Sequence, residues 1–111
     1  MTIPESVIKI GDKAFYECLS MRSIEGMERV TQIGDDAFYF CHDLHSVTIP
    51  ETVTRIGKNA FIACSGLTSI EGMEGVTQIE EYAFSNCAQL TSVTIPRGVT
   101  QITKKAFEYC N

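Results

Sequence analysis

The residues best suited to chemistry are five cysteines, which recur every 23 residues at Cys18, Cys41, Cys64, Cys87 and Cys110. So many cysteines in a short chain are typical of a disulfide framework. Stacked repeats, however, would hold neighbouring thiols with parallel Cβ vectors, and a straight column converges on no metal ion. We therefore predict a structural column of small buried side chains. Cys110, near the end of the column, is the strongest candidate for a reactive or intermolecularly bridged thiol.

Two histidines, His42 and His45, are the other candidate metal ligands. Asp43 lies beside them, but no other repeat carries the pair, and a zinc site needs further convergent ligands. We interpret them as two solvated histidines. The sequence contains no Ser/His/Asp arrangement and no glycine-rich phosphate loop that we would propose as a site. It therefore predicts no enzyme activity, no catalytic residue, no bound metal and no cofactor.

The amino-acid composition narrows the classes of partner that the chain could bind. Nine basic and fourteen acidic residues give a net charge of −5, without a block of like charge. This balance disfavours nucleic acids and anionic membranes, both of which call for a basic surface. No apolar run approaches the length of a membrane-spanning helix, and no targeting signal is visible in the sequence. We expect a folded chain without membrane insertion.

Other columns keep the same period and define the elements that must position the cysteines. One repeat runs from Leu44 to Gly66. Its Leu-x-x-Val-x-Ile start predicts a short strand with alternate residues inward, which Pro50 ends because proline lacks an N–H. A second extended run covers residues 53–56. The following Ala-Phe-x-x-Cys spacing predicts a helical or 3₁₀ turn. The phenylalanine column that would stack beside the cysteines consists of Phe15, Phe38, Phe61, Phe84 and Phe107.

The recurring phrase S-V-T-I-P-x-x-V-T-x-I-x-x-x-A-F-x-x-C resembles the BspA-like class of leucine-rich repeats over essentially the whole chain. That resemblance implies a cell-surface or secreted protein of bacteria or protists, whose arrays serve adhesion and protein binding. The resemblance implies no catalytic residue in this chain. Two differences from typical members are the short chain and the lack of a leader or wall anchor.

Together these patterns predict an α/β solenoid. We expect a single right-handed leucine-rich-repeat domain over residues 1–111, with about five turns that end near the five cysteines. One parallel β-ladder, a ladder of short extended segments and helical or 3₁₀ turns would form its sides.

The repeats also alternate in kind. Ile49-Pro50 and its equivalents at 3 and 95 alternate with Gly-Met at 26 and 72. We interpret this as a volume swap, in which methionine fills the space that glycine leaves. The outward column alternates between threonine and glutamate, which keeps like charges two turns apart. Duplication of a two-turn ancestor explains the same alternation and is compatible with both interpretations.

Two surfaces are candidates for binding. A flat strip of small and acidic residues follows the predicted main sheet: Ser23, Glu25, Ser46, Thr48, Ser69, Glu71, Ser92 and Thr94. The helical-turn side is richer in the aromatic and large apolar residues that anchor interfaces: Tyr16, Tyr39, Phe40 and Ile62. The ligand could be a protein or a glycan.

No polar capping repeat is visible at either end. We favour a fragment of a longer surface or secreted protein that acts as a non-enzymatic binding or adhesion module. The alternative is a structural array that self-associates end to end through uncapped turns.

Overall fold

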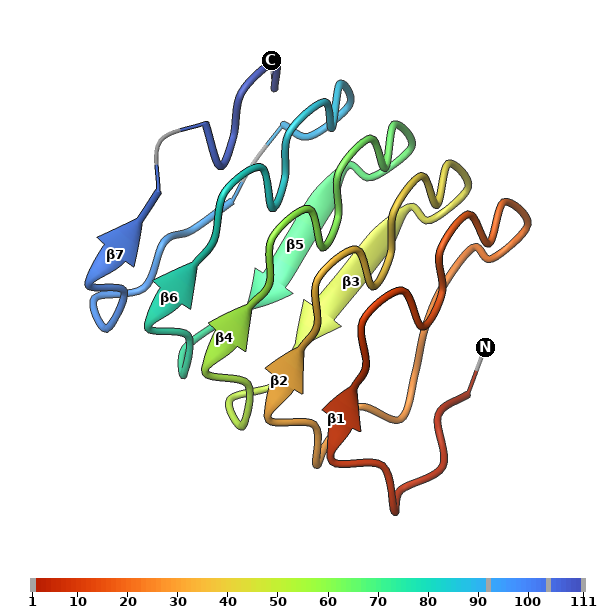
Figure 1. The fold of residues 1–111 in the computed structure, drawn as a ribbon, viewed down its shortest axis with the longest axis vertical. Coiled ribbons are helices and arrows are strands. Elements are labelled where there is room, and N and C mark those ends of the chain that lie inside the picture. The colour runs from red at the N-terminus through yellow and green to blue at the C-terminus, as the bar shows by residue number, and fades with distance from the viewer. Residues whose placement is uncertain (1, 92, 104, 111) are drawn as a thin grey trace.

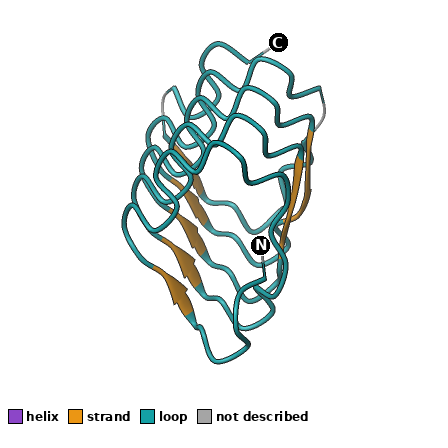
Figure 2. Cartoon of the chain, turned by 90° about the vertical axis from the view of Figure 1, so that its right-hand side faces the viewer, coloured by secondary structure: helices purple, strands orange, loops and turns teal. Residues whose placement is uncertain are grey.

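The computed structural model describes residues 2–91, 93–103 and 105–110, except for the side chain of Gln101. The chain winds into a stack of similar turns with strands on two sides (Figures 1 and 2). A repeat solenoid with parallel strands, as the sequence predicts, is confirmed. Within the described residues there is no helix.

The longer ladder is a five-stranded parallel sheet of two-residue strands in the order β1-β2-β4-β6-β7. Its strands are β1 (Lys9–Ile10), β2 (Gln32–Ile33), β4 (Arg55–Ile56), β6 (Gln78–Ile79) and β7 (Gln101–Ile102). The constant repeat length keeps identical positions in register, so that Ile33 pairs with Ile56 and Ile56 with Ile79. These three isoleucines are buried.

The second sheet contains β3 (Ser46–Ile49) and β5 (Ser69–Gly72), paired in parallel with Ser46 opposite Ser69. Val47 and Ile49 are buried, whereas Ser46 and Thr48 are exposed, as the alternation predicts. Residues 2–25 repeat this arrangement only as one bridge, between Thr2 and Glu25.

Pairing along this second sheet is interrupted after every second turn. The proline-type turns pair with the glycine-type turns that follow them, as in Ile49 with Gly72. Among the described residues, no backbone pairing joins Glu25 to Thr48, or Glu71 to Thr94. The two-turn period of the sequence is therefore also a period of the hydrogen bonding.

The two glycines at these interruptions are explained by backbone geometry. Gly26 and Gly72 have φ of +92° and +88°, and a Cβ on either would lie 2.2 or 2.1 Å from the carbonyl oxygen of Ile3 or Ile49. Only glycine tolerates both conditions. Met27 and Met73 are buried, as the volume swap requires, but the swap alone does not explain why glycine is needed.

The prediction of helical or 3₁₀ turns is wrong. The segments that end at each cysteine form successive turns, which we call the turn edge. Here backbone N–H groups alternate in direction: Phe61 donates to Ala83 in the next repeat (2.7 Å), whereas Cys64 donates back to Phe61 (3.3 Å). A helix would keep these donors within one repeat. The left-handed φ of Asn59 (59°) and its equivalents directs alternate amides along the stack.

The interior is filled by columns of identical side chains. Neighbouring phenylalanine rings stack face to face, with centroids 4.8 Å apart for Phe38 and Phe61 and 5.3 Å apart for Phe61 and Phe84. These three rings are fully buried, whereas Phe15 and Phe107, on the outermost turns, are half-buried. Each central ring therefore contacts a ring on both sides, which a single turn cannot provide.

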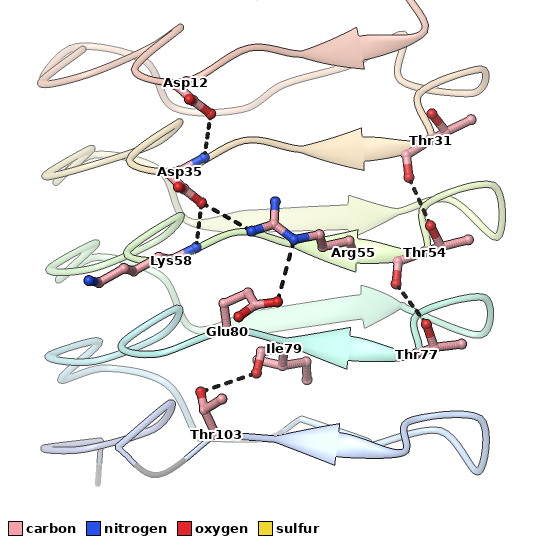
Figure 3. A network of polar contacts seen from close by, with 10 residues as sticks. All are labelled: Asp12, Thr31, Asp35, Thr54, Arg55, Lys58, Thr77, Ile79, Glu80 and Thr103. Atoms are coloured by element: carbon pink, nitrogen blue, oxygen red, sulfur yellow. Dashed lines mark hydrogen bonds and ion pairs between the residues drawn. The ribbon is translucent and has the colours of Figure 1, made fainter.

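Polar side chains add further links between turns (Figure 3). Asp35 Oδ1 accepts the backbone N–H of Lys58 at 2.9 Å, and Asp12 does the same for Asp35. Arg55 contacts both Asp35 (3.5 Å) and Glu80 (3.4 Å). A column of threonine hydroxyls donates to the carbonyl one repeat earlier: Thr31, Thr54, Thr77 and Thr100.

Candidate binding surfaces

The cysteine column lies against the phenylalanine column, and its thiols are hydrogen-bonded. Cys64 Sγ donates to the carbonyl oxygen of Phe38 at 3.1 Å, and Cys87 Sγ donates to that of Phe61 at 3.2 Å. All five cysteines are free thiols. Cys41, Cys64 and Cys87 are buried, and Cys18 and Cys110 are half-buried. The central thiols are therefore sequestered from solvent.

The thiols differ in acidity. Burial raises the pKa of Cys18 above its usual value. The hydrogen bond that Cys87 shares with Cys110, together with burial, raises the pKa of Cys87 well above its usual range. The same interaction lowers the pKa of Cys110 to about 7, because it stabilises the thiolate. Cys110 is therefore a half-buried thiol with a lowered pKa, and its Sγ donates to the carbonyl oxygen of Phe84 at 2.9 Å.

On the turn edge, three of the predicted binding residues contact one another. Tyr16 and Tyr39 stack with ring centroids 4.6 Å apart, and Phe40 packs against Tyr39 at 4.4 Å. His42 meets the ring of Phe40 edge-on at 5.5 Å. We call Tyr16, Tyr39, Phe40 and His42 the aromatic cluster. Ile62 is half-buried one repeat further on, where its carbonyl accepts the amide of Phe40.

The aromatic cluster lies at the surface. Tyr16 is 41% exposed, and Leu19 nearby in the chain is 52% exposed. Tyr39 and Phe40 are half-buried, and the cluster is flanked by Lys13, whose Nζ lies 5.7 Å from the Tyr16 ring centroid. An exposed group of contacting aromatic rings is the kind of surface that anchors protein interfaces.

The predicted strip on the β3–β5 side is flat and polar. Ser69 is half-buried, and Ser92 lies outside the described residues. The other strip residues are exposed: Ser23, Glu25, Ser46, Thr48, Glu71 and Thr94.

Sequence reasoning did not identify a hollow at the edge of this strip. It is lined by Ile24, Glu25, Gly26, Met27, Glu28, Thr48 and Pro50, and its volume is about 220 Å³. We call it the glycine hollow. It opens where Glu25 and Thr48 fail to pair. The recurrence of the same residues 46 positions later was the signal in the sequence that could have revealed it.

His42 and His45 are both exposed. Across residues 2–91, 93–103 and 105–110, no group of three or more His, Cys, Asp or Glu side chains is placed to hold a metal ion. The same residues form no helix long and apolar enough to cross a membrane.

Comparison with known proteins identifies a family of repeat proteins that matches this arrangement of stacked turns. The profile of the BspA type leucine-rich repeat region matches residues 1–111 as six copies. The chain belongs to the BspA-type leucine-rich-repeat family. A search of curated proteins finds no match.

Solved structures of bacterial leucine-rich-repeat proteins are similar to this BspA-type array. A protein from Bacteroides ovatus is 34% identical with a TM-score of 0.90, over 96% of this chain and 30% of its own. The leucine-rich repeat protein of T. pallidum is 32% identical with a TM-score of 0.76, over 79% and 41%. A leucine-rich cell surface protein from Faecalibacterium prausnitzii is 30% identical with a TM-score of 0.72, over 97% and 38%. The chain therefore spans less than half the length of these relatives.

Proposed function

We propose that this BspA-type array is a non-enzymatic module that binds a protein or glycan ligand at the cell surface, within a longer adhesive protein. The main support is the aromatic cluster. The interior already contains an uninterrupted phenylalanine column, so Tyr16, Tyr39 and Phe40 are additional aromatic rings at the surface. The similarity to a leucine-rich cell surface protein supports the location.

The chain itself offers a matched variant for testing this surface. Ser85 and Asn86 occupy the positions of Tyr39 and Phe40 two turns later. Tyr39→Ser with Phe40→Asn would therefore introduce residues that the same backbone already accepts. Asn also suits the left-handed conformation of Phe40, whose φ is 57°. The fold should be retained while the aromatic cluster is lost.

The experiment applies the purified array to immobilised extracellular proteins and glycans of defined identity. We expect wild-type protein to bind at least one of them and the double variant to lose most of that binding, with an unchanged melting temperature. Equal binding by both proteins would show that the aromatic cluster is not the contact surface. Failure of the wild type to bind any of them would count against adhesion.

A second candidate function, self-association, is favoured by exposed apolar side chains on the outermost turns. On the C-terminal turn Ile95 is 38% exposed and Ile102 is 47% exposed, whereas the equivalent residues of a central turn, Ile49 and Ile56, are buried. Stacking of another copy would cover these residues. Light scattering across a concentration series tests this proposal, because a constant monomer mass would contradict it.

A further inference from the structure

The glycine hollow has the chemistry of a binding site for a basic side chain. Ile24, Met27 and Pro50 contribute apolar surface, while Glu25 and Glu28 are exposed beside it. A lysine could lay its methylene chain on the apolar residues and direct its ammonium group to the carboxylates. The volume of about 220 Å³ is below that of typical small-molecule pockets, so it suits one side chain.

The carboxylates around the hollow form no ion pair with any residue that the structure describes. Among the described residues, both ion pairs are made by Arg55, on the five-stranded sheet. Glu28 also belongs to a column of exposed charged residues one repeat apart, which holds carboxylates at Glu5, Glu28, Glu51 and Glu74 and ends in Arg97. Arg29 follows Glu28 in the chain, but it forms no ion pair with any of the described residues. The region therefore attracts cations.

The hollow's residues recur two turns later. Glu71, Gly72 and Glu74 take the places of Glu25, Gly26 and Glu28. The other four positions carry the same residue types, which are buried or exposed to the same degree: Ile70, Met73, Thr94 and Pro96. Gly72 has the same left-handed φ as Gly26. Successive phenylalanine rings of the interior column lie 5.3, 4.8, 5.3 and 5.1 Å apart, so two sets separated by two turns lie about 10 Å apart.

We propose that the glycine hollow and its repeat bind two lysine side chains of one extended segment of a partner protein. Residues i and i+3 of a polyproline II helix lie on one side of it, about 9 Å apart, which matches the two-turn spacing. The inference deepens the proposed binding function by assigning a second surface, separate from the aromatic cluster, and a partner chemistry.

The test uses a proline-rich peptide with two lysines three positions apart, followed by amide chemical shifts of the labelled protein. We expect shifts at Glu25, Gly26 and Gly72, binding that weakens with salt, and weaker binding by a peptide with one lysine. Glu25→Gln with Glu28→Gln should lower affinity about tenfold, since each exposed ion pair contributes up to about fivefold. Thr48→Lys should block the hollow by supplying a competing ammonium group.

The control variant, Asp43→Asn with Glu81→Gln, removes two exposed carboxylates elsewhere and should leave the affinity unchanged. Equal weakening by both double variants would show that only net charge matters and would overturn the proposal. Absence of shifts at millimolar peptide would also overturn it, as would equal binding of the one-lysine and two-lysine peptides. Tyr39→Ser with Phe40→Asn should bind the peptide normally, so failure of the aromatic surface and failure of the hollow are distinguishable.

Discussion

The thiol of Cys64 donates a hydrogen bond to the carbonyl oxygen of Phe38, 26 residues earlier, across 3.1 Å. The same oxygen accepts the backbone N–H of Cys41. Each central thiol thus links one turn to the one before it while remaining out of solvent. This relationship makes the cysteine column a structural element, and it leaves only the outermost members accessible to reagents.

We therefore predict a fixed order of alkylation by iodoacetamide in the folded protein. Cys110 should react first, and its rate should rise through about pH 7 and level off above it, because its pKa is lowered to about 7. Cys18 should react more slowly at neutral pH, since its pKa is raised. The three buried thiols should react only after unfolding. Peptide mass spectrometry over time measures all five sites, and early labelling of Cys64 would contradict the prediction.

Removing a central ring should destabilise the array strongly. Phe61→Ala is expected to cost about 3–5 kcal/mol in the free energy of unfolding, because it leaves a cavity between two stacked rings. Phe15→Ala is the matched control, since Phe15 is half-buried with one stacked neighbour. In urea unfolding, Phe15→Ala should lower the free energy of unfolding by clearly less than Phe61→Ala does. Similar losses for both variants would mean that stacking on two sides adds little.

The glycine requirement at the two-turn interruptions can be tested directly. Gly72→Ala should cost about 1–3 kcal/mol from its left-handed backbone alone, and the 2.1 Å approach of its Cβ to Ile49 O should add to that. Gly11→Ala meets nothing within 4 Å and should change stability by less than about 0.5 kcal/mol. Thermal unfolding of the two variants makes the comparison. A tolerated Gly72→Ala would refute the close-approach argument.

Asp35 should contribute more as a hydrogen-bond acceptor than as an ion-pair partner. Its carboxylate accepts the Lys58 amide at 2.9 Å, whereas its contact with Arg55 is longer and partly exposed. Asp35→Ala is expected to cost about 1–2 kcal/mol, and Asp35→Asn, which keeps an acceptor oxygen, about half of that or less. If chemical denaturation shows equal losses for both variants, the charge is the dominant contribution.

The sequence predicted the features that depend on period alone. A constant 23-residue spacing places Ser46 opposite Ser69 and Phe38 against Phe61, so the parallel register and the buried columns could be foreseen. The conformation of the turn edge could not be foreseen, because Phe and Cys three residues apart fit a helix as well as successive turns. The destination of the Phe61 amide, in the next repeat, is not a local property of the sequence.

Of the candidate surfaces, the aromatic cluster could be predicted from the sequence, whereas the glycine hollow could not. Tyr39 and Phe40 stood out because they are aromatic residues outside the repeated phenylalanine and cysteine columns, and the structure places them in contact with Tyr16 or with each other. The glycine hollow depends on the left-handed Gly26 and on a missing strand pairing, neither of which the volume interpretation required. For the turn edge, the asparagines at positions 59 and 86 were a usable signal in the sequence, since asparagine favours the positive φ that both residues adopt.

The interrupted pairing between Glu25 and Thr48 has a mechanical consequence. A solenoid with uniform bonding would resist stretching equally at every turn. Here the β3–β5 side has a seam after each two-turn module, while the five-stranded sheet and the turn edge continue across it. Because fewer hydrogen bonds cross a seam, we expect the rod under axial tension to part there before a module opens. Extension would then proceed in steps of about two repeats, and the genetic unit of the sequence would also be its unit of rupture.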